Sequence, residues 1–288
     1  MTTPDRPNVL WFVLEDVGPT MGCYGDSVAR TPNVDALAGE GRRYTRAFSP
    51  TGVCSPARAA LQTGCYPHEL GAHHMRTDTH DVEGLPGSYD AVPPHYVTGF
   101  TESLRQAGYY CTLNWKADYQ FGRPFTMWDH HAESAGWRDD ARGDDQPFFA
   151  MVTNGVTHES GMWPPGEDDQ FGGAVADPET DPDDVTVPPY LVDSEATRTA
   201  IARYYDNLAR SDEWVGEVLD RLDADGHAED TVVVLTGDHG PGLPRQKRWP
   251  YDSGTHVPLV VRWPGETDGE AVEDLVSLVD LPATTLSL

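Results

Sequence analysis

Lysine is nearly absent from this sequence. Only Lys116 and Lys247 occur among 288 residues, and the other eighteen cationic side chains are arginines. Acidic residues are abundant, so that 47 Asp and Glu against 20 Lys and Arg give a formal net charge of −27. A nucleic-acid binder needs a basic face that neutralises phosphates, and an anionic membrane surface would repel a chain this acidic. The composition therefore argues against nucleic-acid and membrane partners.

The acid-rich stretches are expected on the surface. The run "DPETDPDD" at 177–184 is typical of a solvated face rather than of a site. A surface rich in acids and poor in lysine suits a high-salt cytoplasm, because salt screens the repulsion between like charges. We therefore expect a halophilic type of surface.

Cysteine and long apolar runs are also scarce. Cys23, Cys54, Cys65 and Cys111 form no C-x-x-C pair and no metal-finger spacing. No apolar run approaches the ~20 residues of a membrane span, and the first residues lack the basic region and cleavage site of a signal peptide. We therefore expect a reduced, cytoplasmic protein in which all the cysteines but Cys54 are small buried apolar side chains.

Apolar runs alternate with helical patterns along the chain. The patterns predict strands at 8–16, 109–115, 147–155, 231–240 and 257–265, and helices at 31–41, at 98–108, after residue 54, around 201–222 and from 274 onward. The region 160–193, rich in proline, glycine and acid, is expected to be an excursion at the surface. Alternating strands and helices predict an α/β fold, a mainly parallel sheet flanked by helices, within one large domain.

Polar residues follow four of the predicted strands. They are Glu15 with Asp16, Lys116, His158, and Asp238 with His239. Ligands of open α/β sheets sit at the carboxyl ends of parallel strands, so we expect one cluster there. Three carboxylates in such a cluster would repel strongly unless a cation lay between them, and oxygen-rich ligation suits calcium or magnesium. The histidine leaves manganese or zinc open, and helix caps or loop hydrogen bonds remain the alternative for each acid pair.

The stretch "GVCSPARAALQTG" at 52–64 places Cys54 at the start of a small-residue helix, with Arg58 one turn later. The free N–H groups and dipole of a helix start favour an anion, so this segment predicts an anion site with a potential nucleophile in it. Lys116 and Lys247 survive in a chain that has otherwise replaced lysine. One interpretation is that both lysines have a role in the site, because an ammonium is a compact point charge that arginine cannot replace everywhere. The alternative is that they are leftover surface residues.

The segment "CSPAR" at 54–58, with Thr63 and Gly64 downstream, resembles the sulfatase signature, in which a Cys or Ser is followed by x-Pro-x-Arg. Other segments resemble the family in the same order: "PNVLWFVLEDVGPTMGCYGD", "TPNVDALAGEGRRYTRAFS", "GYYCTLNWKADYQF", "THES" and "TGDHGPGLPRQKRWPYDSGTHVPLVVRWPG". The resemblance spans nearly the whole chain. It implies the alkaline phosphatase-like fold, and "ED…GCYGD" and "GAHHMR" are similar to the heparan N-sulfatase branch and its bacterial relatives.

The resemblance implies a role for each site residue. Cys54 would be oxidised by the formylglycine-generating enzyme to formylglycine, whose hydrate is the nucleophile, and Arg58 would orient it. Lys116 and Lys247 would hold sulfate oxygens, and His158 would serve the leaving group or the sulfate. The divalent metal, usually calcium in this family, would be held by Glu15, Asp16, Asp238 and His239 together with the modified Cys54.

The sequence departs from the family pattern at several positions. Glu15 stands where Asp is more frequent, His239 where Asn is common, and Asp118, two residues past Lys116, where a histidine is often found. The longer arm of Glu15 is expected to shift the metal. The family's smaller C-terminal domain, which helps wall the substrate pocket, is expected to be missing from residues 1–288, so that this stretch is the catalytic domain with an open site.

The expected activity is hydrolysis of a sulfate ester or sulfamate, on a small sulfated substrate that we expect to be a sugar. His73, His74 and Asp118 are candidate substrate contacts, and for the two histidines an exposed loop is the alternative. A phosphate or phosphonate ester hydrolase on the same scaffold, or an inactive sulfatase-like binding protein, is the alternative function.

Overall fold

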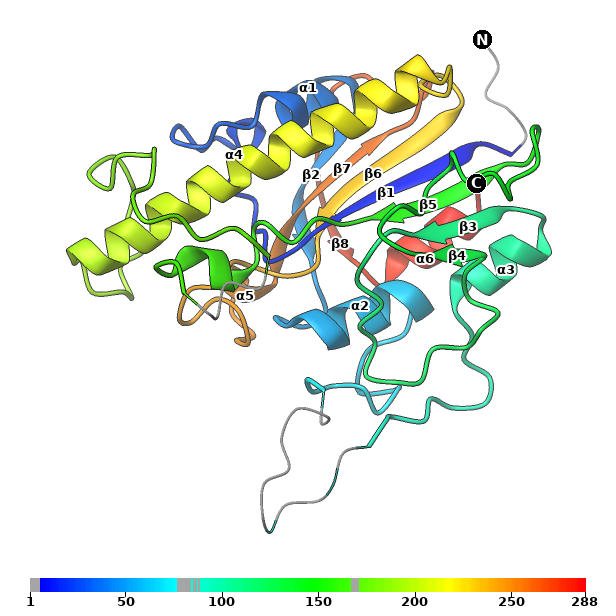
Figure 1. The fold of residues 1–288 in the computed structure, drawn as a ribbon, viewed down its shortest axis with the longest axis horizontal. Helices are drawn as coiled ribbons and strands as arrows, with labels where there is room; N and C mark the ends of the chain where they lie inside the picture. The colour runs from blue at the N-terminus through cyan, green and yellow to red at the C-terminus, as the bar shows by residue number, and fades with distance from the viewer. Residues whose placement is uncertain (1–5, 77–83, 85–86, 88, 167–170) are drawn as a thin grey trace.

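The computed structural model describes residues 6–76, 84, 87, 89–166 and 171–288. Figure 1 shows a twisted sheet in the middle of the molecule, with helices on both of its faces. The strands are β1 (Asn8–Leu14), β2 (Arg42–Phe48), β3 (Tyr110–Leu113), β4 (His130–His131), β5 (Phe148–Val152), β6 (Thr231–Gly237), β7 (His256–Arg262) and β8 (Ala271–Ser277). Their order across the sheet is β4-β3-β5-β1-β6-β7-β2-β8.

The sheet is mainly parallel, as the sequence predicts. Strand β7 runs antiparallel to both of its neighbours, β6 and β2, and every other neighbouring pair of these strands is parallel. The helices are α1 (Pro32–Glu40), α2 (Cys54–Thr63), α3 (Phe100–Gln106), α4 (Glu195–Ala224), α5 (Asp252–Thr255) and α6 (Asp280–Leu286). Two 3-10 turns, η1 (Gly22–Tyr24) and η2 (Glu159–Met162), complete the described elements.

Alternating side chains of β1 build two cores, one on each face of the sheet. Trp11 and its neighbours at i±2 pack against α3 and α6, whereas Phe12 and its neighbours at i±2 pack against α1 and α4. Because both faces are covered, the strand reads as a continuous apolar run. The helix predicted around 201–222 belongs to α4, whose N-terminal half also packs on a smaller cluster that includes Met162 and Val185.

Two expectations need correction. The segment from residue 274 is not one helix: β8 runs to Ser277, parallel to β2, and α6 begins only at Asp280. Pairing with the edge of β2 decides this, a long-range contact that local pattern does not contain. Among the cysteines other than Cys54, Cys111 is buried, but Cys23 and Cys65 are only partly buried.

The excursion predicted for 160–193 begins at residue 163, because Ser160, Gly161 and Met162 belong to the 3-10 turn η2 and are buried; within residues 163–166 and 171–193 the structure has no helix or strand. No helix among the described residues has both the length and the apolar character needed to cross a membrane.

The packing of the core beneath α3 can be tested by a substitution at Phe149. Its ring is fully buried and contacts Trp11, Phe100 and Trp128, with ring centroids 5.3, 5.1 and 6.1 Å away. We expect Phe149→Ala to lower the free energy of unfolding by about 3–5 kcal/mol, measured by urea denaturation, because the cavity removes these contacts. Phe125→Ala, at a side chain that is 92% exposed, should change it by less than about 0.5 kcal/mol. Equal losses in the two variants would contradict this packing.

Candidate functional site

The polar cluster predicted at the strand ends is present in the structure. Strands β3, β5, β1 and β6 are consecutive neighbours and parallel, so their carboxyl ends share one edge of the sheet. Leu14 pairs with Gly237 in register, and therefore Glu15–Asp16 and Asp238–His239 leave the sheet side by side. The Asp238 N–H donates to the Leu14 carbonyl at 3.0 Å, which continues the ladder past the strands.

The acids make loop hydrogen bonds as well as forming a cluster. Asp238 Oδ1 accepts from the N–H groups of Asp16 and His239 at 3.0 and 2.9 Å. Asp16 has a left-handed backbone with φ of 54°, a conformation that costs of order 1 kcal/mol or more and tends to be kept at functional sites. The acid pairs were expected either to converge in one cluster or to make loop hydrogen bonds, and in the structure they do both.

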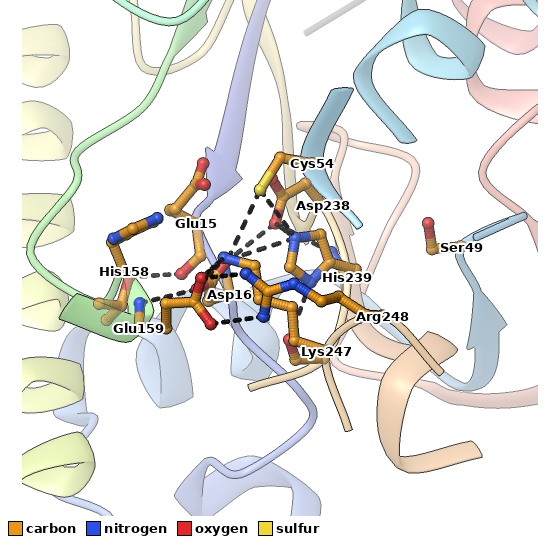
Figure 2. Close-up of polar contacts among 12 residues, drawn as sticks. Glu15, Asp16, Ser49, Cys54, His158, Glu159, Asp238, His239, Lys247 and Arg248 are labelled. Atoms are coloured by element: carbon orange, nitrogen blue, oxygen red, sulfur yellow. Dashed lines mark hydrogen bonds and ion pairs between the residues drawn. The ribbon is translucent and has the colours of Figure 1, made fainter. Parts of the chain in front are cut away.

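Helix α2 brings the thiol to this edge. Val53 is extended, the helix begins at Cys54, and the segment from Cys54 to Gln62 is buried. Figure 2 shows Cys54 Sγ directed at His239 and Asp16; it lies 3.2 Å from His239 Nε2 and 4.0 Å from Asp16 Oδ1. Burial, together with Glu15 and Asp16, raises the pKa of the Cys54 thiol well above its usual value.

Arg58 ties the two acid pairs together from the next turn of α2. Its Nη2 donates to Glu15 Oε2 at 2.7 Å, and its Nε donates to Asp238 Oδ2 at 3.2 Å. The side chain is 2% exposed, so this is a buried ion pair in which a planar guanidinium spans acids of two strands. Burial opposes the charge, but the two carboxylates still raise the pKa of Arg58 above its ordinary value.

The two lysines both point into the cluster rather than into solvent. Lys247 Nζ donates to both carboxylate oxygens of Asp16, at 3.0 and 2.8 Å, and Lys116 Nζ donates to Glu15 Oε1. Their side chains are 2% and 11% exposed, so they are not surface remnants. Burial would raise the pKa of Glu15, yet Lys116 and Arg58 hold it well below its usual value.

Sequence reasoning missed a second ion-pair layer. The Glu159 N–H donates to Asp16 Oδ2 at 2.8 Å, and Glu159 Oε1 lies 3.2 Å from Lys247 Nζ. Arg248 donates both ends of its guanidinium fork to the same carboxylate, at 2.7 and 2.5 Å, as Figure 2 shows. Each of these two residues directly follows a predicted site residue, and that adjacency was the signal available in the sequence.

His158 lies next to the cluster on the β5 side. Its Nδ1 accepts from the Ser160 N–H at 3.2 Å, so the neutral ring carries its proton on Nε2. The ring packs edge-on against Phe171 with centroids 4.8 Å apart, and burial lowers the pKa of His158. The Nε2–H is therefore a hydrogen-bond donor held in place by its neighbours.

The three predicted substrate contacts lie farther out. His73 is exposed, His74 bonds the Met75 carbonyl at 2.8 Å and the Tyr89 hydroxyl, and buried Asp118 pairs with Arg76. Tyr89, Arg76 and Asp118 line one cavity of about 160 Å³. Asp118 thus lines this cavity and His74 contacts one of its lining residues, Tyr89, and contact with a substrate remains a prediction.

The acids and their partners suit a divalent cation. Ligand atoms of Glu15, Cys54, Asp238 and His239 all lie within 4.8 Å of one another, and ligands on opposite sides of a calcium ion stand about 5 Å apart. Asp16 Oδ1 adds an oxygen 3.2 Å from His239 Nε2.

The charges support the same fit. The four carboxylates of the cluster and four cations face one another: Glu15, Asp16, Glu159 and Asp238 against Arg58, Lys116, Lys247 and Arg248. A divalent ion would therefore give the pocket a net charge of about +2, which suits an anionic ligand.

The profile of the family described as Sulfatase matches residues 7–144 and 136–288. The chain belongs to the sulfatase family. An ulvan-active sulfatase of Formosa agariphila is 41% identical to this sulfatase-family chain, in a match that covers 99% of the chain and 52% of that protein. The human N-sulphoglucosamine sulphohydrolase is 31% identical over 98% of the chain and 60% of its own length. The chain thus spans about half to three fifths of these relatives.

Among solved structures, the phosphonate monoester hydrolase SpPMH from Silicibacter pomeroyi has the same fold, with a TM-score of 0.69 and 19% identity. That match covers 98% of the sulfatase-family chain and 73% of the hydrolase.

Removing Arg58 should destabilise the fold. We expect Arg58→Met to lower the free energy of unfolding by about 3–5 kcal/mol in urea with a chelator present, because Glu15 and Asp238 are left buried without their partner. Arg138→Met is the matched control, since it breaks an exposed pair with Asp225 and should change little. A loss in Arg58→Met no larger than in the control would show that the buried pair carries no stability.

Proposed function

We propose that residues 1–288 are the catalytic domain of a hydrolase that cleaves a sulfate ester or sulfamate on a carbohydrate. The observation that carries the proposal is the meeting of Cys54 with buried acids, His239 and the chain's two lysines at one sheet edge. The names of the relatives, ulvan-active sulfatase and N-sulphoglucosamine sulphohydrolase, support sugars as the substrate class.

The proposal also includes a divalent cation and a formylglycine at position 54. Glu15, Asp16, Asp238 and His239, with the side chain at position 54, would hold a divalent cation, for which the oxygen-rich set favours calcium over magnesium or manganese. When bound, the cation polarises sulfate oxygens and lowers the pKa of a coordinated hydroxyl. A formylglycine made from Cys54 supplies, as its hydrate, the hydroxyl that attacks sulfur.

The chain's own cations hold the anion. Lys116 follows β3 and Lys247 lies in the loop after β6, and their ammonium groups would donate to sulfate oxygens. Arg58 keeps Glu15 and Asp238 in place. The charged groups around the sulfate are therefore already oriented when negative charge develops on its oxygens, and they would stabilise that charge without first having to move.

His158 serves the leaving group in this proposal. The bond between sulfur and the ester oxygen breaks, and that oxygen, or the nitrogen of a sulfamate, takes up the proton that the attacking hydroxyl loses, while the His158 Nε2–H would donate a hydrogen bond to the same atom. Water supplies the oxygen that remains on sulfur, and one proton is released with the sulfate. The net reaction converts the substrate and water into the free sugar and sulfate.

The aldehyde and its reaction are tested together on the full chain from its native host. We expect the peptide around Cys54 to have the mass of the aldehyde rather than the thiol, and the protein to hydrolyse an aryl sulfate. Cys54→Ala should lose activity by roughly 10³-fold or more, because it removes the nucleophile. Cys65→Ala, at a partly buried cysteine outside the cluster, should keep it.

The alternative functions have distinct outcomes in the same assay. A rate on aryl phosphate higher by orders of magnitude would make the protein a phosphate ester hydrolase. No turnover by protein that carries both aldehyde and metal would make it a binding protein.

Calcium binding has a readout besides activity. Calcium at about 100 times its dissociation constant should raise the free energy of unfolding by about 2.7 kcal/mol relative to chelator-treated protein. Asp238→Asn should lose most of this gain, whereas Asp118→Asn, at a buried acid paired with Arg76, should retain it. A gain that is equal in both variants would move the cation away from this cluster.

A further inference from the structure

Aromatic and arginine side chains stack beside the second lysine of the site. The rings of Trp249 and Tyr251 are 6.0 Å apart and nearly parallel, at 9°. The Arg245 guanidinium lies 5.1 Å from the Tyr251 ring and 5.4 Å from the Tyr190 ring. We call these four side chains, in the order Tyr190, Arg245, Tyr251 and Trp249, the aromatic ladder.

The end of the ladder is exposed. Trp249 and Tyr251 are 47% and 45% exposed, although rings of this size usually bury most of their surface. Exposed neighbouring aromatic side chains are enriched where proteins bind partners or ligands, because a flat ring offers a large apolar area at low entropic cost. The position of Trp249 and Tyr251 in the molecule indicates which kind of ligand they would bind.

The ladder is attached to the site through a short backbone segment. Lys247 lies between Arg245 and Trp249 in the chain and donates to Asp16. The Arg248 N–H donates to the Gly52 carbonyl at 2.6 Å, and a Cβ on Gly52 would stand 2.7 Å from the Trp249 carbonyl oxygen. Trp249 is therefore held against the residues that lead into Cys54.

The loop keeps an unusual backbone to present both sides. Arg245 and Arg248 have φ of 64° and 73°, a left-handed conformation that costs an arginine of order 1 kcal/mol or more. Gln246 and Lys247 are buried, and the Gln246 amide donates to the Tyr190 hydroxyl at 3.0 Å. One strained turn thus directs Lys247 inward to the cluster and leaves Arg248 and Trp249 outward.

We propose that the aromatic ladder binds a second sugar ring of a sulfated oligosaccharide whose sulfate lies at the Cys54 cluster. This inference rests on the proposed function. The C–H face of a pyranose ring would pack on the free face of Trp249. A chain with net charge −27 repels a polyanionic saccharide, so stacking on Trp249 and the positive charge of Arg245 would supply the local attraction.

Chain length of the substrate is the test, on the full protein. For Trp249→Ala we expect kcat/KM on an ulvan-derived sulfated tetrasaccharide to fall about tenfold, the effect of truncating an aromatic anchor, while the rate on glucosamine N-sulfate stays within about twofold. Trp249→Phe should retain most of the tetrasaccharide rate. Phe125→Ala, at an exposed ring far along the chain, should leave both substrates unchanged.

A binding measurement separates this inference from the proposed function. The desulfated tetrasaccharide should bind the wild type in titration calorimetry, and about tenfold more weakly to Trp249→Ala. If no sulfate is hydrolysed but this binding is observed, the proposed function fails and the subsite stands. Equal loss on the short and long substrates, or no loss of binding, would overturn the subsite. The subsite would also be overturned if Trp249→Ala left saccharide binding unchanged but dissociated a dimer of the protein. The aromatic ladder would then be a contact between two copies of the chain.

Discussion

One buried guanidinium holds the functional edge of this protein together. Glu15 and Asp238 leave adjacent parallel strands side by side, where two desolvated carboxylates would repel each other. Arg58 spans them with separate nitrogens, at 2.7 and 3.2 Å. Since Arg58 lies one helical turn after Cys54, the same contact fixes the start of α2 over the strand ends. The position of the thiol is thus a consequence of an ion pair between helix and sheet.

Further ion pairs extend outward from that pair. Lys247 brings the loop after β6 onto Asp16, and Glu159 joins this lysine to Arg248 at the surface. Residues with left-handed backbone lie along this path, at Asp16, Arg245 and Arg248. Backbone strain of this kind persists where surrounding contacts over-determine it. One loop can therefore carry a buried lysine and an exposed aromatic pair a few residues apart.

Much of the fold follows from local pattern. The buried strands were predictable because runs such as β1 are covered on both faces, and α4 because its apolar side chains keep helical spacing. Strand β8 was not, since its conformation comes from pairing with β2. Within the site, acids and lysines next to strand ends were predictable, whereas the Glu159 link to Arg248 joins positions 89 residues apart.

The sequence by itself determined which chemical groups are available and on which strand ends they stand, because strand and helix periods are properties of consecutive residues. Its motif order was also sufficient to indicate the sulfatase family. Only the tertiary structure decided that β3, β5, β1 and β6 are neighbours and which carboxylate each cation meets. Strand order and ion-pair partners depend on contacts between residues far apart in the chain, and burial makes those contacts strong enough to select one arrangement.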